Sequence, residues 1–313
     1  MAAAMTPSPA MPGMAVLLPD GLTPNMTIGA VTIGTWISLF ALGIVLCSSY
    51  LYFLRFPEDR AWYKVIVGAI TVVCIVDTIA NLVWAYQWIV RLWGSVPGAG
   101  IIPHGFYINV FCYALACTLT QGFYGWRLLG FGRQNRPLVA LILLSALVQQ
   151  SFVVWVMVFW GHHTSFSQIK SIFPTAYGWL VTGIVGDALV SGGLIYYQRL
   201  KAQQSVKKPN MEFQAILSKS VQANVLALIS QVLTLVLFKV DAGMFFLLND
   251  VVIAKIYAFS LLTTLNVRSS SWAIFSVSAS TKSHSEHISL SSMPRPAVVR
   301  ITQTITIHEE EYK

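Results

Sequence analysis

Phe245–Arg268 reads FFLLNDVVIAKIYAFSLLTTLNVR, an apolar run long enough to cross a bilayer that carries Asp250 and Lys255 within it. A lysine in the middle of a membrane costs between about 2.5 kcal/mol on insertion scales and far more on an isolated helix, so we expect Lys255 to face protein rather than lipid. Buried charges in proteins are usually paired. The stretch therefore predicts a helix surrounded by other helices, one of which supplies an acid to the lysine.

The composition of the whole chain is that of a membrane protein. Of its 313 residues, 56% are hydrophobic and 10% are charged, and the mean hydropathy is +0.66, which leaves too little polar surface to cover a water-soluble fold. The formal net charge of +8 would suit nucleic-acid binding if the basic residues gathered on one soluble face, but they lie in short segments between apolar runs. We therefore predict an integral membrane protein that has the lipid bilayer as its partner and binds no nucleic acid.

Seven apolar stretches are each close to the length that about 30 Å of hydrocarbon requires at about 1.5 Å per residue. Short segments with Pro, Gly or charged residues separate them. The sequence therefore predicts an all-α fold, a polytopic bundle of seven transmembrane helices. We place the spans at residues 28–54, 63–89, 105–129, 138–160, 175–197, 221–238 and 245–266.

Lys and Arg are distributed unequally between the two sides of the membrane that this topology defines. The segments after the first, third and fifth stretches, together with the C-terminal tail, hold 16 of the 20 basic residues. The opposite side holds Arg91, Lys170 and Lys239, and Lys255 lies within a span. Because basic residues are enriched in cytosolic loops, this predicts an N-terminus outside and a C-terminus in the cytosol, in the plasma membrane or an endomembrane.

The two ends of the chain differ from its apolar middle. Residues 1–27 carry Asp20 as their one charge, and Asn25 begins an Asn-Met-Thr sequon that fits N-glycosylation. Residues 269–313 are rich in Ser and Thr with scattered charge, a composition typical of disorder. We therefore divide the chain into a short extracellular or lumenal tail (1–27), a seven-helix domain (28–268) and a disordered cytosolic tail (269–313).

Three motifs carry a resemblance to a known family. Residues 56–64 read FPEDRAWYK, residues 121–127 read QGFYGWR, and residues 255–268 follow the pattern K-x-Y-x-x-S-L-L-x-x-L-N-x-R. With Asp77 and Asp187, these motifs resemble a large seven-helix family of fungal, basidiomycete-type integral membrane proteins, over about residues 30 to 270. The resemblance implies the fold and a membrane location but no activity, because none is established for the family. The pattern positions here are Lys255, Tyr257, Ser260, Leu261, Leu262, Leu265, Asn266 and Arg268.

Away from their ends, the predicted spans contain four acid or lysine side chains: Asp77, Asp187, Asp250 and Lys255. At about 1.5 Å per residue from the cytosolic ends, Lys255 and Asp187 lie about 16 Å deep, and Asp77 lies about 20 Å deep. Lys255 can therefore meet either acid, whereas Asp250, five residues away on the same helix, points elsewhere. We group Asp77, Asn81, Asp187 and Lys255 as a polar cluster, which either binds a ligand or fixes the register of the helices.

No enzyme class is favoured by these residues. A seven-helix zinc hydrolase needs histidines at ligand spacing within the spans, but the six histidines lie at the outer ends or in the tail. A retinal-type Schiff base on Lys255 would need more support than a lysine in the seventh helix. We therefore expect no catalytic residue, no metal site and no cofactor.

Two kinds of membrane function remain open. Seven spans, an outer N-terminus and a basic cytosolic face favour a receptor-like sensor or a structural or interaction protein, although the seventh helix lacks the Asn-Pro-x-x-Tyr pattern of rhodopsin-like receptors. The polar cluster favours a small-solute or proton-coupled transporter, although the chain has no visible internal repeat. A small-molecule ligand, and a cytosolic partner that binds the loops and tail, are compatible with both.

Overall fold

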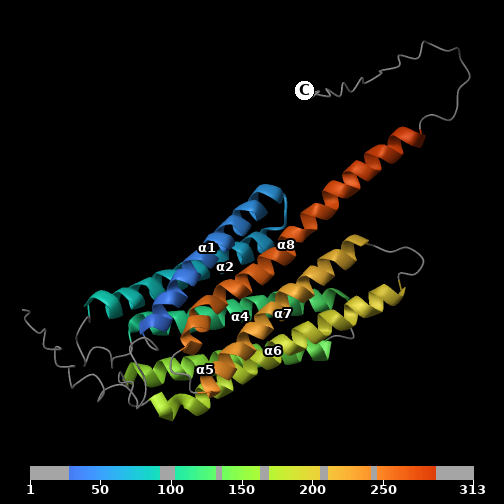
Figure 1. Ribbon diagram of the computed structural model, residues 1–313. Coiled ribbons are helices and arrows are strands. Elements are labelled where there is room, and N and C mark those ends of the chain that lie inside the picture. Colours follow the sequence, from blue (N-terminus) through green and yellow to red (C-terminus); the bar gives the residue numbers. More distant parts are fainter. Residues whose placement is uncertain are drawn as a thin grey trace, which may run out of the picture. The chain divides into compact units, whose positions relative to one another are not determined.

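The computed structural model describes six ranges of the chain: 28–91, 103–131, 136–162, 169–204, 211–240 and 245–286. For residues 131, 160–162, 169–173, 201–204, 211–216 and 268–286 it describes the backbone alone. Within these ranges the chain is helical apart from short connections (Figure 1). The elements are α1 (Ala30–Arg55), α2 (Ala61–Tyr86), the short π-helical segment η2 (Gln87–Arg91), α4 (His104–Phe131), α5 (Arg136–His162), α6 (Ile169–Gln204), α7 (Met211–Lys239) and α8 (Phe245–Glu286).

Among the described residues, seven helical stretches are long and apolar enough to cross a membrane, which confirms the predicted count and fold class. Each of the seven predicted stretches corresponds to one of these helical stretches, and α8 continues to Glu286. The division of the chain into a domain and two tails stays a prediction. The seven spans are Ala30–Arg55, Ala61–Arg91, His104–Gly130, Arg136–Phe159, Pro174–Leu200, Leu217–Lys239 and Phe245–Val267.

The bundle distributes apolar and polar side chains in the manner of a protein that lies in lipid. Large apolar side chains face outward, as at Phe40, which is 74% exposed, and Leu147, which is 64% exposed. Asp77, Asp187 and Lys255 are at most 1% exposed. A soluble protein shows the opposite distribution, because its charged side chains are almost always in water. The outer faces of these helices therefore suit the hydrocarbon of a bilayer.

Helices that follow one another in the chain pack side by side, from α1 against α2 to α6 against α7, and α4 also touches α6. α8 occupies a central place, since its side chains form hydrogen bonds or an ion pair with α1, α2, α4, α6 and α7. Of an 18-residue apolar stretch of α8, 67% of the residues are buried, whereas the corresponding share in α5 is 28%. The expectation that the stretch carrying Lys255 is surrounded by other helices is thus confirmed.

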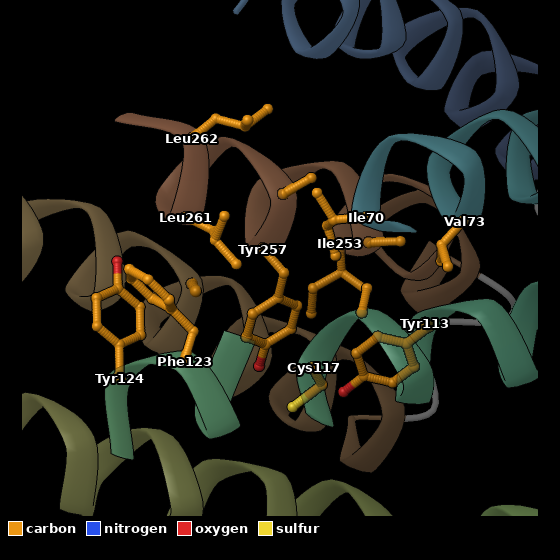
Figure 2. Close-up of a cluster of buried hydrophobic side chains, with 14 of the residues drawn as sticks. Ile70, Val73, Tyr113, Cys117, Phe123, Tyr124, Ile253, Tyr257, Leu261 and Leu262 are labelled. Carbon is orange, nitrogen blue, oxygen red and sulfur yellow. The ribbon is translucent and has the colours of Figure 1, made fainter. Parts of the chain in front are cut away.

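The core around α8 combines aliphatic side chains with tyrosines. Such a core packs by van der Waals contact and leaves each buried tyrosine hydroxyl in need of a hydrogen-bond partner. Figure 2 shows the oxygens of Tyr257 and Tyr113 pointing toward Cys117. The cluster includes Ile70 and Val73 of α2, Tyr113, Cys117, Phe123 and Tyr124 of α4, and Ile253, Tyr257, Leu261 and Leu262 of α8 (Figure 2).

Two glycines allow helices to approach closely. A Cβ atom built on Gly105 of α4 would lie 2.5 Å from the backbone oxygen of Ala80 and 2.8 Å from the Cβ of Trp84, both on α2. A Cβ on Gly34 of α1 would lie 2.6 Å from a methyl carbon of Val251 on α8. Small residues let helix backbones meet in this way inside membranes.

The connection between α1 and α2 is tied to the helix ends. Tyr52 of α1 donates a hydrogen bond from its hydroxyl to Asp59 Oδ2 at 2.8 Å, and Lys64 Nζ donates to the backbone oxygen of Pro57 at 2.5 Å. These four residues belong to, or adjoin, the FPEDRAWYK motif that the sequence analysis singled out. The motif therefore has a structural role in closing this turn.

Candidate functional site

Lys255 of α8 forms an ion pair with Asp77 of α2, and both side chains are buried. The same ammonium group also donates to the backbone oxygen of Val251 at 3.2 Å, one turn earlier in α8. The sequence offered Asp77 and Asp187 as partners for Lys255. Within the described ranges, the structure pairs it with Asp77.

Two amide side chains complete the surroundings of Asp77. Asn109 of α4 donates to Asp77 Oδ1 at 2.9 Å, and Asn81 donates to Oδ2 at 3.3 Å and to the backbone oxygen of Val251 at 3.5 Å. Both carboxylate oxygens thus have a donor, and the opposite charge is supplied by Lys255. We call Lys255, Asp77, Asn81 and Asn109 the ion-pair centre.

Asp187 of α6 belongs to a different group of side chains. Its Oδ2 accepts a hydrogen bond from the hydroxyl of Tyr257 on α8, and its Oδ1 accepts one from Gln121 Nε2 on α4 at 3.0 Å. The predicted cluster is therefore divided: Asp77, Asn81 and Lys255 come together, whereas Asp187 has partners of its own. Whether either group binds a ligand stays a prediction.

The hydrogen bonds continue from Asp187 into a network of neutral polar side chains. Gln231 of α7 donates to Tyr257 Oη and, at 2.8 Å, to Tyr113 Oη. Cys117 Sγ donates to Gln149 Oε1 of α5 at 3.3 Å. We call this group the Asp187 centre; it draws on five helices and comprises Tyr113, Cys117, Gln121, Gln149, Asp187, Gln231 and Tyr257.

Glycines of α6 make room for this network. A Cβ on Gly183 would lie 2.6 Å from Gln231 Oε1 and 3.0 Å from Gln149 Nε2. A Cβ on Gly186 would lie 2.6 Å from Gln121 Nε2. The amide groups therefore rest directly against the α6 backbone, one turn before Asp187.

The positions of the motif at residues 255–268, on α8, have distinct structural roles. Lys255 and Tyr257 contact the two acids, and the hydroxyls of Ser260 and Thr264 lie 2.8 and 2.9 Å from Tyr124 Oη of α4. Asn266 Nδ2 donates to the backbone oxygen of Ser48 on α1 at 2.9 Å. Buried leucines at Leu261, Leu262 and Leu265 fill the spaces between them.

The remaining predictions concern Asp250, Arg268, Asn25 and a metal site. Asp250 is buried on α8 and forms no ion pair with Lys255 in the part of the chain that the structure describes, in line with its predicted direction. The side chain of Arg268 and the whole of Asn25 lie outside the described residues. Among the described residues, no group of three or more His, Cys, Asp or Glu side chains could hold a metal ion.

Four amides that complete the two centres were not predicted from the sequence: Asn109, Gln121, Gln149 and Gln231. Each is fully buried in an apolar span. A neutral amide inside a membrane span is itself a signal, because its hydrogen-bonding groups find no partner in lipid. Counting amides together with acids would have identified these side chains, although not which acid each one binds.

Comparisons with known proteins assign neither a family nor a function. No protein-family model, no curated protein and no solved structure matches this chain.

Proposed function

We propose that this multi-pass membrane protein is a receptor-like sensor in which α8 responds to the state of the buried polar centres. The observation that carries the proposal is the set of contacts of α8. Lys255 binds α2, Tyr257 binds α6 and α7, and Asn266 binds α1. Because one helix makes all of these contacts, a ligand that changes one of them would also affect the others.

Such a sensor needs two arrangements of its helices that a ligand stabilises to different extents. Tyr257 is well placed to differ between them, because its hydroxyl contacts both Asp187 and Gln231. A ligand that occupies Asp187 would release the hydroxyl and shift α8 relative to α6. Shifts of 1–2 Å of this kind are a common form of switching.

A proton-coupled or small-solute transporter is the second candidate, and a specific observation favours it. The partners of Asp187 among the described side chains are neutral, so this acid is available to bind a proton or another cation. Ionisable groups inside a bundle mark ion and proton pathways in many membrane proteins.

Asp187→Asn separates the two functions. In a sensor, neutralising Asp187 should change hydrogen exchange in α8 and in the α1 segment around Ser48, which Asn266 contacts. Proteoliposomes with an imposed proton or Na⁺ gradient should show no protein-dependent flux. Asp250→Asn, which removes another buried acid, is the matched control; because Asp250 is itself on α8, the deciding readout is the α1 segment around Ser48, where this variant should leave exchange unchanged. Exchange would be followed by mass spectrometry and flux with a dye inside the vesicles.

Two results of this experiment would reject the sensor. A flux that is strong in the wild-type protein and lost in Asp187→Asn would establish the transporter. Hydrogen exchange that changes only around residue 187, with α8 and α1 unaffected, would show that the centres are not linked through α8.

The orientation in the membrane is part of the proposal. Sixteen of the 20 Lys and Arg residues on one side support an outer N-terminus, a cytosolic C-terminus and a cytosolic partner that binds the loops and tail. The motifs of residues 56–64, 121–127 and 255–268 likewise support membership of the fungal seven-helix family.

We expect a protease added to sealed cells to remove an N-terminal tag and spare a C-terminal one. The reverse pattern would overturn the orientation.

A further inference from the structure

Asp187 is buried in the middle of the bundle and has no charged partner among the described side chains. Its side chain is 0% exposed in the middle of α6, and no basic side chain in the described ranges lies within ion-pair distance. A carboxylate in a medium of low dielectric is unfavourable unless it is neutralised by a proton or a cation. The two neutral donors, Tyr257 and Gln121, supply hydrogen bonds but no charge.

Among the described side chains, no free cation lies within ion-pair distance of Asp187. Lys255 lies two residues from Tyr257 on α8, but it is already paired with Asp77. The described side chains that bond to or closely contact the Asp187 centre are otherwise neutral, and a further acid, Asp250, acts electrostatically on Tyr113. The neutral side chains are Tyr113, Cys117 and Gln121 of α4, Ser145 and Gln149 of α5, Asn224 and Gln231 of α7, and Tyr257 of α8.

The same centre contains buried oxygens without a hydrogen-bond donor. Gln121 Oε1 and Gln231 Oε1 are both buried and both unpartnered. The amide nitrogen of Gln121 donates to Asp187, and that of Gln231 donates to Tyr113 and Tyr257. The oxygens of the same two amides therefore belong to this centre. Gln149 Nε2 is an unpartnered donor there, but it cannot neutralise a carboxylate.

These observations distinguish between the two ways to neutralise Asp187. A proton would add one donor, which cannot satisfy two further carbonyl oxygens. A hard metal cation takes several oxygen ligands at once, carboxylate and amide carbonyl among them. In the structure Gln149 Nε2 donates to neither oxygen, so a cation placed between Asp187 and the two amide oxygens would satisfy all three groups, whereas a proton on Asp187 would satisfy one. With one negative charge in the centre, a divalent ion would leave an uncompensated buried charge, so a monovalent ion is favoured.

We propose that Asp187, with the side-chain oxygens of Gln121 and Gln231, forms a binding site for a small monovalent cation in the middle of the bundle. The site goes beyond the proposed function, because it would exist in a sensor and in a transporter alike. In a sensor it would hold one arrangement of the helices. In a transporter it would be the place where the ion stops during passage.

The test is the thermal midpoint of the purified protein in detergent as NaCl replaces choline chloride at constant ionic strength. Because an ion that binds the folded state stabilises it by mass action, we expect the midpoint to rise by on the order of a few degrees at saturating Na⁺. LiCl and KCl would report the size preference. Asp187→Asn should abolish the rise, and Asp250→Asn should retain it.

Three outcomes would overturn the cation site. One is a wild-type midpoint that is the same in Na⁺, Li⁺, K⁺ and choline. Another is a midpoint that changes with pH alone, which would identify the proton as the ligand of Asp187. The third applies even if Asp187→Asn does not fold. In the wild-type protein, the rise of the midpoint in Na⁺ should become smaller at lower pH, because protons compete with Na⁺ for the carboxylate. A rise that is the same at every pH would exclude Asp187 as the ligand. Loss of the cation effect with coupled exchange in α8 would leave the sensor proposal standing.

Discussion

Replacing Lys255 with methionine is expected to lower the free energy of unfolding by about 3 kcal/mol or more, the range found when one partner of a buried ion pair is removed. The variant leaves Asp77 buried with the donors Asn81 and Asn109 but without an opposite charge. Methionine has a similar length and fills the same space, so the loss reports charge rather than a cavity. The measurement is thermal or denaturant unfolding of the purified protein in detergent.

Lys239→Met is the matched control for Lys255→Met. Lys239 is exposed at the end of α7, and removal of an exposed charge changes stability by about 0.5 kcal/mol at most. If both methionine variants were equally stable, the buried ion pair would not contribute to the fold as the structure indicates.

Gly105→Ala is the second change with a large expected effect. The added methyl group would meet the backbone oxygen of Ala80 at 2.5 Å and the Cβ of Trp84 at 2.8 Å, and neither atom can rotate away. α4 and α2 would have to separate, also disturbing the bond between Asn109 and Asp77. We expect a loss of about 3 kcal/mol, at the upper end of the usual range for overpacking.

Gly122→Ala tests the same chemical change on the same helix without the clash. A Cβ at Gly122 would find no atom within 4 Å. Alanine is a better helix former than glycine, by about 1 kcal/mol, so this variant should be unchanged or slightly more stable. Equal destabilisation of the Gly105 and Gly122 variants would show that α2 and α4 do not meet closely at Gly105.

The number of spans could be predicted because it depends on properties that are local in sequence. Each apolar run is long enough for one membrane-spanning helix, and each of the seven expected spans corresponds to one helical stretch among the described residues. The buried position of the last span could also be predicted, because Lys255 requires protein around it. Both predictions use one segment at a time.

The partner of Lys255 could not be predicted in the same way. Depth along the membrane left both Asp187 and Asp77 within reach of Lys255, but the choice depends on how each helix is rotated about its own axis. At about 3.6 residues per turn, Lys255 and Tyr257 point about 160° apart, so one faces α2 and the other faces α6. Rotation is set by the packing of all seven helices together, which no single stretch of sequence contains.

The amides of the two centres show the same limit. Gln121 and Gln231 come from different helices and both belong to the Asp187 centre, whereas Asn109, in the same helix as Gln121, belongs to the ion-pair centre. Their presence in apolar spans indicates buried hydrogen bonds. Only the three-dimensional arrangement assigns each one to an acid.

The central claim is that α8 joins two separate centres, with Lys255 paired to Asp77 and Asp187 bound to Tyr257. Double-mutant cycles test it most directly, using unfolding free energies of Lys255→Met combined with Asp77→Asn and, separately, with Asp187→Asn. The account predicts a coupling energy of about 2 kcal/mol or more between Lys255 and Asp77, and additivity within about 0.5 kcal/mol between Lys255 and Asp187. Strong coupling to Asp187 together with additivity for Asp77 would contradict it.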